Sequence, residues 1–181
     1  QNWGRYKDID GDGIAYRTLP GNTNARAAYL TRGTGHNEFG IYSERPIDWQ
    51  NNLDRLTRKH DSARKAVPAP VLEEAQGAKI GIIAYGSSDP AVQEARDRLR
   101  KEGFETSYLR LRALPLGEPT REFVAKYDRV YVVEMNQDGQ MQQLIQLHVP
   151  EHATRVRSSR NCNGLPISAR FITESILEQE R

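Results

Sequence analysis

The residues best suited to hold a cation lie near the start of the chain, in the segment Asp8-Ile-Asp-Gly-Asp-Gly. Acidic oxygens at alternate positions, with a glycine at the sixth, match the opening of a calcium loop. The twelfth position, which should supply a bidentate glutamate, is Leu19, and Pro20 stands where the exiting helix should begin. The segment is therefore interpreted as an Asp/Gly-rich turn, with a calcium loop as the alternative.

A second candidate is the anion loop Gly86-Ser87-Ser88, which lies between a predicted strand and a predicted helix. Backbone N–H groups at a helix start, together with the helix dipole, can hold an anion. The loop lacks the glycine spacing of a dinucleotide fingerprint and the lysine of a P-loop, and Asp89 would repel a phosphate. An ordinary strand-to-helix turn is the favoured interpretation. Glu134 and Asn136 follow another apolar strand and would face this loop across a crevice if the two strand ends are adjacent.

A third polar cluster, Thr31-Arg-Gly-Thr-Gly-His-Asn-Glu, combines a cation, a histidine and a carboxylate within a loop. Loops of this content often contact ligands or partners. A histidine–glutamate pair can do acid–base chemistry, but no serine or cysteine nucleophile motif accompanies it. His148 and His152 have the spacing of helical zinc ligands, but Pro150 separates them and no HExxH pattern is present, so we exclude zinc.

These candidates must be positioned by a helix and an α/β segment that the hydrophobic pattern predicts. Residues 1–41 show no sustained apolar period and predict a loop-rich, extended arm. Residues 46–67 place apolar or small residues on one helix stripe, and Pro68 and Pro70 end the helix. His60 lies on this stripe, so we expect a half-buried, hydrogen-bonded histidine there.

From Gly77 onward, apolar strands alternate with helix patterns. We expect strands at 79–85, 106–111, 129–134 and about 154–159. One helix is expected to end near residue 101, two helices to cover residues 118–126 and 140–148, and a last helix to begin at residue 168. Such alternation predicts a three-layer, Rossmann-like α/β domain with a mostly parallel sheet. We therefore divide the chain into residues 1–70, an arm with an amphipathic helix, and residues 71–181, the α/β domain.

Composition narrows the class of protein. The chain has 181 residues with a net charge of +2, which does not imply nucleic-acid binding, and no apolar run long enough for a membrane span. Cys162 is the only cysteine, so this chain alone cannot build a disulfide framework or a cysteine-ligated cluster. We expect a cytoplasmic protein with no nucleic-acid or membrane partner. The start at Gln1 favours a piece of a longer polypeptide.

A set of short motifs, spread over about residues 4–176, resembles one family. The motifs are Arg5-Tyr-Lys-Asp-Ile-Asp-Gly-Asp-Gly-Ile, Tyr16-Arg-Thr-Leu-Pro-Gly, Thr31-Arg-Gly-Thr-Gly-His-Asn-Glu, Tyr42-Ser-Glu-Arg-Pro, Ala113-Leu-Pro, Tyr127-Asp-Arg-Val-Tyr-Val-Val-Glu-Met-Asn and Asp138-Gly-Gln-Met. Together they resemble the C-terminal part of the alpha subunit of 2-oxoacid:ferredoxin oxidoreductases, in the 2-oxoglutarate-type branch.

The resemblance implies an enzyme complex that converts a 2-oxo acid and coenzyme A into acyl-CoA and carbon dioxide and passes electrons to ferredoxin. It implies thiamine diphosphate, magnesium and an iron–sulfur cluster in the full complex, held by the beta subunit and a preceding alpha-subunit domain. Gly11-Asp12-Gly13 does not follow an apolar strand, as the diphosphate motif of such enzymes does. We therefore expect no cofactor, no metal and no catalytic residue on this chain.

The α/β region would then resemble the transketolase C-terminal domain and serve subunit packing. Residues 1–70 would link it to the preceding domain, with Arg32, His36, Asn37 and Glu38 as contacts to neighbouring domains. The expected partners are the rest of the alpha subunit, the beta subunit, and ferredoxin and coenzyme A through the complex. Alone, the chain is expected to be inactive and to self-associate. The alternative is a stand-alone module that binds an anion or coenzyme A over Gly86-Ser87-Ser88.

Overall fold

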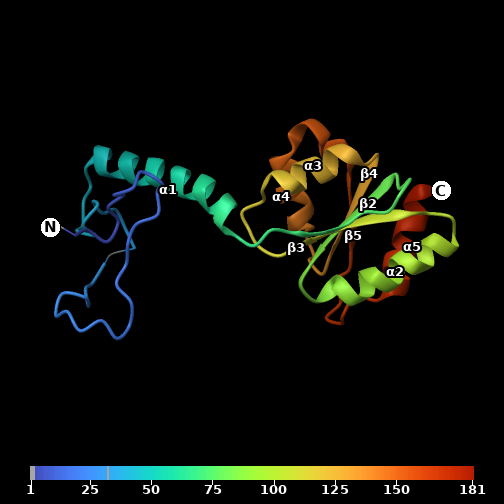
Figure 1. The fold of residues 1–181 in the computed structure, drawn as a ribbon, viewed down its shortest axis with the longest axis horizontal. Coiled ribbons are helices and arrows are strands. Elements are labelled where there is room, and N and C mark those ends of the chain that lie inside the picture. The colour runs from blue at the N-terminus through green and yellow to red at the C-terminus, as the bar shows by residue number, and fades with distance from the viewer. Residues whose placement is uncertain (1–2, 32) are drawn as a thin grey trace. The chain divides into compact units, whose positions relative to one another are not determined.

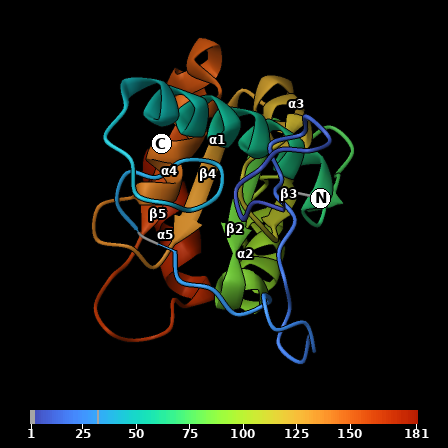
Figure 2. The ribbon, with the colours of Figure 1, turned by 90° about the vertical axis from the view of Figure 1, so that its left-hand side faces the viewer.

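The computed structural model describes residues 3–31 and 33–181 and divides the chain into two compact units, Gln1–Ala66 and Val67–Arg181. The N-terminal unit consists of the arm and helix α1 (Pro46–Ala66). The described part of the arm contains turns and one isolated bridge between His36 and Tyr42. Parts of the arm lie beside α1, and another part loops away from the helix (Figures 1 and 2).

The arm and α1 are joined mainly by polar contacts. Arg55 of α1 donates from Nη1 to the Gly13 carbonyl over 3.1 Å, and Ser62 donates its hydroxyl to the Asp12 carbonyl over 2.6 Å. Gly13 is in the left-handed region, with φ of 81°, and a Cβ there would overlap the backbone of α1. This close approach therefore requires glycine at position 13.

The second unit is a five-stranded sheet in the order β1-β3-β2-β4-β5. The strands are β1 (Val71–Glu73), β2 (Ile80–Tyr85), β3 (Thr106–Leu111), β4 (Arg129–Glu134) and β5 (Val156–Arg160). β1 pairs antiparallel with β3, and the other pairs are parallel. The predicted mostly parallel α/β sheet is confirmed. β1 was not predicted, because three residues are too few to show the alternating pattern of a strand.

Two helix layers cover the sheet (Figure 1). Helices α2 (Asp89–Lys101) and α5 (Ala169–Glu180) pack on one face. Helices α3 (Glu118–Lys126) and α4 (Gln140–His148) pack on the other. Two short 3₁₀ helices lie in the connections: η1 (Gly86–Ser88) between β2 and α2, and η2 (Pro150–Arg155) between α4 and β5. The three-layer arrangement matches the prediction.

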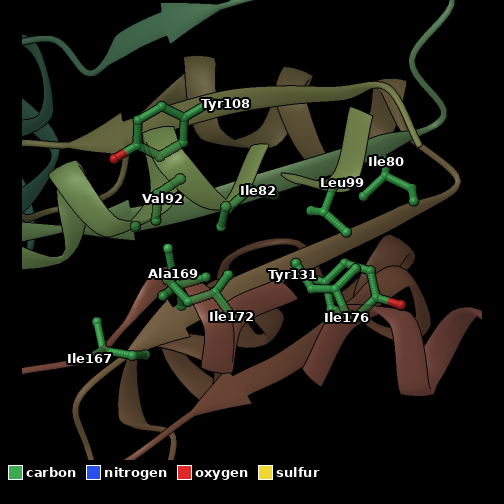
Figure 3. Close-up of a cluster of buried hydrophobic side chains, with 13 residues drawn as sticks. Ile80, Ile82, Val92, Leu99, Tyr108, Tyr131, Ile167, Ala169, Ile172 and Ile176 are labelled. Atoms are coloured by element: carbon green, nitrogen blue, oxygen red, sulfur yellow. The ribbon is translucent and has the colours of Figure 1, made fainter. Parts of the chain in front are cut away.

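The core on the α2/α5 side follows from strand alternation, since every second side chain of a strand points to the same face. Ile82 of β2 is fully buried and pairs in register with Tyr108 of β3 and Tyr131 of β4. Figure 3 shows Leu99 of α2 and Ile176 of α5 within this cluster. On the other face, Gly81 leaves room for Phe123 of α3, whose ring a Cβ there would overlap.

Helix α1 forms as predicted, but its apolar stripe is not buried within the described part of the N-terminal unit. Trp49 is 51% exposed, Leu53 53% and Leu56 39%. The prediction of a half-buried His60 is wrong, because this residue is exposed on the same stripe. The arm covers the polar stripe of the helix instead. Among the described residues, no helix combines the length and the apolar character that crossing a bilayer needs.

Candidate functional site

The sheet has a switch point where the carboxyl ends of β2 and β4 lie side by side. After β2 the chain moves through α2 to β3 on one side, whereas β4 lies on the other side of β2. In open α/β sheets, ligands bind in the crevice at such a point. The predicted anion loop Gly86-Ser87-Ser88 forms η1 directly after β2. Gly86 has a φ of 62° with open space around the position of a Cβ, whereas Ser88 is buried.

The start of α2, just beyond this loop, carries a negative charge and lacks one N–H. Pro90 lies in the first turn. Asp89 accepts the hydroxyl hydrogen of Tyr108 over 2.9 Å and lies 3.3 Å from the Arg110 guanidinium. Burial raises the pKa of Tyr108, and the hydrogen bond to Asp89 raises it further. The Asp89 carboxylate therefore already supplies the negative charge that the helix dipole favours at this end of α2. Anion binding at Gly86-Ser87-Ser88 stays a prediction.

Glu134, which was expected to face this loop from the end of β4, instead binds the backbone at the start of α4. It is fully buried, and its carboxylate accepts the backbone N–H groups of Met141 over 3.0 Å and Gln142 over 3.1 Å. Its charge therefore caps the first turn of α4. Burial raises the pKa of Tyr85, and the nearby Glu134 carboxylate adds to this rise. Asn136 is half-buried, and its amide donates to Gln140 over 3.1 Å.

The histidine cluster belongs to the N-terminal unit, whereas the switch point belongs to the α/β unit. His36 stacks on the Tyr6 ring with centroids 4.0 Å apart, and its carbonyl accepts the Asn52 amide over 2.6 Å. Asn37 accepts the N–H groups of Phe39 and Ile41, which closes a local turn. The Glu38 carbonyl accepts the Tyr6 N–H over 2.9 Å. Arg32 lies outside the described residues.

The aspartates of the calcium-like segment bind different groups. Asp8 accepts two guanidinium hydrogens of Arg58, over 2.9 and 3.2 Å, and the Gly13 N–H over 3.0 Å. Asp10 accepts the hydroxyl hydrogen of Tyr16, and Asp12 accepts the Ile14 N–H. Burial favours a higher pKa for Asp8, but the Arg58 and Gly13 hydrogen bonds outweigh it and lower the pKa.

The acidic side chains of this segment therefore hold a turn together. Within residues 3–31 and 33–181, no three His, Cys, Asp or Glu side chains are grouped so that they could hold a metal ion.

Arg55 is the polar residue that the sequence reasoning missed. Its side chain is only 8% exposed and lines a cavity of about 480 Å³ in the N-terminal unit. The guanidinium carbon lies 5.6 Å from the centre of the Tyr6 ring, and burial lowers the pKa of Arg55. A sequence signal was available, because polar residues recur on α1 at alternating four- and three-residue steps. They are Asp48, Asn52, Arg55, Lys59 and Ser62.

Comparison with known proteins decides the family. Residues 78–171, a little over half of the chain, match the family described as pyruvate:ferredoxin oxidoreductase core domain II. The chain belongs to this family. The matched core domain II runs from just before β2 to the start of α5, so it includes the switch point and Glu134. The arm and α1 lie outside the matched residues.

Relatives of core domain II extend the similarity. Subunit alpha of 2-oxoacid:ferredoxin oxidoreductase 2 from Aeropyrum pernix is 28% identical over 149 residues, which are 80% of this chain and 22% of the relative. The chain thus spans about a fifth of the length of this curated relative.

Two solved structures are also similar. A 2-oxoglutarate:ferredoxin oxidoreductase from Magnetococcus marinus, with 2-oxoglutarate, coenzyme A and succinyl-CoA bound, is 25% identical with a TM-score of 0.74. The similarity covers 100% of this chain and 31% of that one. A split-gene transketolase in an inactive tetramer covers 59% of this chain and 39% of its own, with 16% identity and a TM-score of 0.48, which is too distant to support an argument.

Proposed function

We propose that this chain is a non-catalytic assembly region of the alpha subunit of a thiamine-diphosphate-dependent 2-oxoacid:ferredoxin oxidoreductase. The complete enzyme would convert a 2-oxo acid, with 2-oxoglutarate as the first candidate, and coenzyme A into acyl-CoA and carbon dioxide, passing electrons to ferredoxin. The observation that carries this proposal is the similarity over the whole chain, arm included, to a solved 2-oxoglutarate:ferredoxin oxidoreductase. A cytoplasmic location is part of the proposal, and a single cysteine is compatible with a reducing compartment.

The polar side chains support a non-catalytic role. The Glu134 carboxylate caps α4, Asp8 is paired with Arg58, and the His36 ring stacks on an aromatic side chain. The residues do not fit the family's cofactors. Asp12 of the glycine-flanked motif is bound to a neighbouring N–H, and Cys162 is exposed and is the only cysteine of the chain. Thiamine diphosphate, magnesium and the cluster would be held by the rest of the complex.

The surface proposed for assembly is the apolar stripe of α1, defined by Trp49, Leu53 and Leu56. These side chains are 39 to 53% exposed, while the arm covers the polar stripe of the same helix. We propose that the rest of the alpha subunit covers this apolar stripe. This proposal is supported by the Aeropyrum pernix relative, an alpha subunit of which this chain matches only 22% of the length.

Reconstitution tests the assembly role. The purified chain is mixed with the remaining alpha-subunit segment and the beta subunit, and complex formation is followed together with dye reduction driven by 2-oxoglutarate. We expect activity only when all pieces are present, and a self-associating, inactive chain alone. Turnover by the chain alone, or full activity of the other pieces without it, would refute the assembly role.

Substitutions on α1 test the docking surface. Burying the exposed half of a leucine side chain contributes about 1 kcal/mol, so the double variant Leu53→Gln/Leu56→Gln should weaken the complex about thirtyfold. Lys65→Gln, on the same helix but off the apolar stripe, is the matched control and should leave the affinity unchanged. Equal affinities for the double variant and the control would show that the stripe is not the docking surface.

A further inference from the structure

The cavity of the N-terminal unit is lined by a buried cation, Arg55, that has no carboxylate within ion-pair distance among the described residues. It is lined by Tyr6, Asp8, Asn37, Glu38, Phe39, Arg45, Asp48, Asn51, Asn52, Asp54, Arg55 and Arg58. Three of the four lining carboxylates already accept hydrogen bonds. Asp8 is paired with Arg58, Asp48 accepts the Ser43 hydroxyl over 2.5 Å, and Asp54 accepts the Gln50 amide over 2.8 Å.

Arg55 is less well satisfied than these carboxylates. Within residues 3–31 and 33–181, its guanidinium makes one hydrogen bond, from Nη1 to the Gly13 carbonyl over 3.1 Å, and its Nε has no hydrogen-bond partner. Within the described residues no carboxylate lies within ion-pair distance of it, whereas Arg58 on the next turn is paired with Asp8. A buried charge is costly unless an opposite charge and hydrogen bonds compensate it. Arg55 therefore offers an unused N–H group beside the cavity, and the nearby Asp8 charge only partly offsets the cost of its burial.

We propose that this cavity binds a carboxylate group through Arg55. Planar guanidinium and carboxylate groups match in geometry, and a charged acceptor would satisfy the donors that the protein leaves open. Arg45 and Asn51, which also line the cavity, have no side-chain partner in the described part of the chain and can donate to the same group. The inference concerns the N-terminal unit and does not depend on the assembly role.

The lining disfavours a phosphate more than a carboxylate. Three arginines and four carboxylates give it a net formal charge of −1, so direct hydrogen bonds from Arg55, and not the overall charge, must hold the ligand, and a dianion would meet more repulsion than a monoanion. Such a carboxylate comes from either a free small acid or an aspartate or glutamate side chain of a polypeptide.

Titration of the intact 181-residue chain, labelled with ¹⁵N, tests the site. Sodium acetate is added at constant ionic strength against sodium chloride, and the Arg55 Nε–H and Asn51 side-chain signals are followed by NMR. A ligand with so few atoms should half-saturate at about millimolar concentration. A saturable shift of these signals with acetate, absent with chloride, supports the proposal.

A second titration distinguishes the two sources. It uses the peptide acetyl-Ala-Glu-Ala-amide, with the glutamine version as control. Saturation by acetate but not by the peptide assigns the site to free acids, and saturation by the acidic peptide but not by its glutamine version assigns it to a side chain. Shifts that grow linearly with all additives, or that appear away from the cavity, overturn the proposal.

Substitutions localise the binding. Arg55→Gln should weaken it at least about tenfold, since a hydrogen bond between charged groups is lost. Lys65→Gln, on the same helix outside the cavity, should bind as the wild type does. Unchanged affinity in a folded Arg55→Gln variant overturns the proposal. If that variant does not fold, the Arg55 Nε–H signal of the wild type decides, because direct binding must shift it.

Discussion

Replacing Glu134 with alanine tests whether this buried carboxylate is a structural cap. The side chain is fully buried and accepts two backbone N–H groups at the start of α4, over 3.0 and 3.1 Å. A hydrogen bond to a charged group contributes about 1.5–3 kcal/mol, and alanine would leave both donors without a protein acceptor. We therefore expect Glu134→Ala to lower the free energy of unfolding by about 3–5 kcal/mol.

Glutamine at this position is the informative comparison. Glu134→Gln keeps one carbonyl oxygen but loses the charge, so we expect about half of the loss seen with alanine. The control is Glu178→Ala, because Glu178 is exposed on α5. Urea unfolding followed by far-UV circular dichroism gives the three free energies, and hydrogen exchange at Met141 and Gln142 reports the cap directly. If Glu134→Ala unfolds within about 0.5 kcal/mol of Glu178→Ala, the capping argument is wrong.

Two further substitutions test the alkaline behaviour of the α/β unit and the packing of the arm. Burial and the hydrogen bond to Glu180 raise the pKa of Tyr131 to about 12, so the stability it contributes is present below about pH 10 and is lost as the pH rises toward 12. Tyr131→Phe should flatten that part of a urea-stability profile, and an unchanged profile contradicts this. Gly13→Ala should cost more than about 2 kcal/mol, because φ is 81° and the new Cβ overlaps the backbone of α1, and should speed hydrogen exchange in residues 8–14. Gly21→Ala, at φ of 87° in open space, should cost only about 1 kcal/mol and is the matched control; equal effects would show that the close approach contributes nothing.

The α/β unit could be predicted in detail because its local signals agree with its packing. β3, β4, α3 and α4 have the predicted ends, since apolar runs are separated by clear breakers. Gly103 ends α2 at φ of 89°, and its N–H donates to the Arg100 carbonyl over 3.0 Å. The last strand was expected at about 154–159 but is Val156–Arg160, because the residues before it form a 3₁₀ helix.

The candidate sites were less predictable, because the type of a residue does not determine which hydrogen-bond or ion-pair partner its side chain has in the fold. Glu134 does lie at the end of its strand, as expected, but whether it faces a crevice or caps a helix depends on where α4 begins in space. Asp8 is similarly part of a calcium-like pattern, yet its carboxylate is paired with Arg58, fifty positions further along the chain. Sequence spacing carries no information about such distant pairs.

Helix α1 shows most clearly what the sequence determines and what the tertiary structure determines. The sequence by itself determined that residues 46–66 are helical and carry two stripes, one apolar and one polar, since helix period and proline breakers are local properties. Only the tertiary structure decided which stripe the arm covers. The glycine-rich arm offers carbonyls and carboxylates, so it binds Arg55 and Ser62 and leaves Leu53 exposed. Burial of this helix depends on the chemistry of its partner surface, which the helix's own residues do not encode.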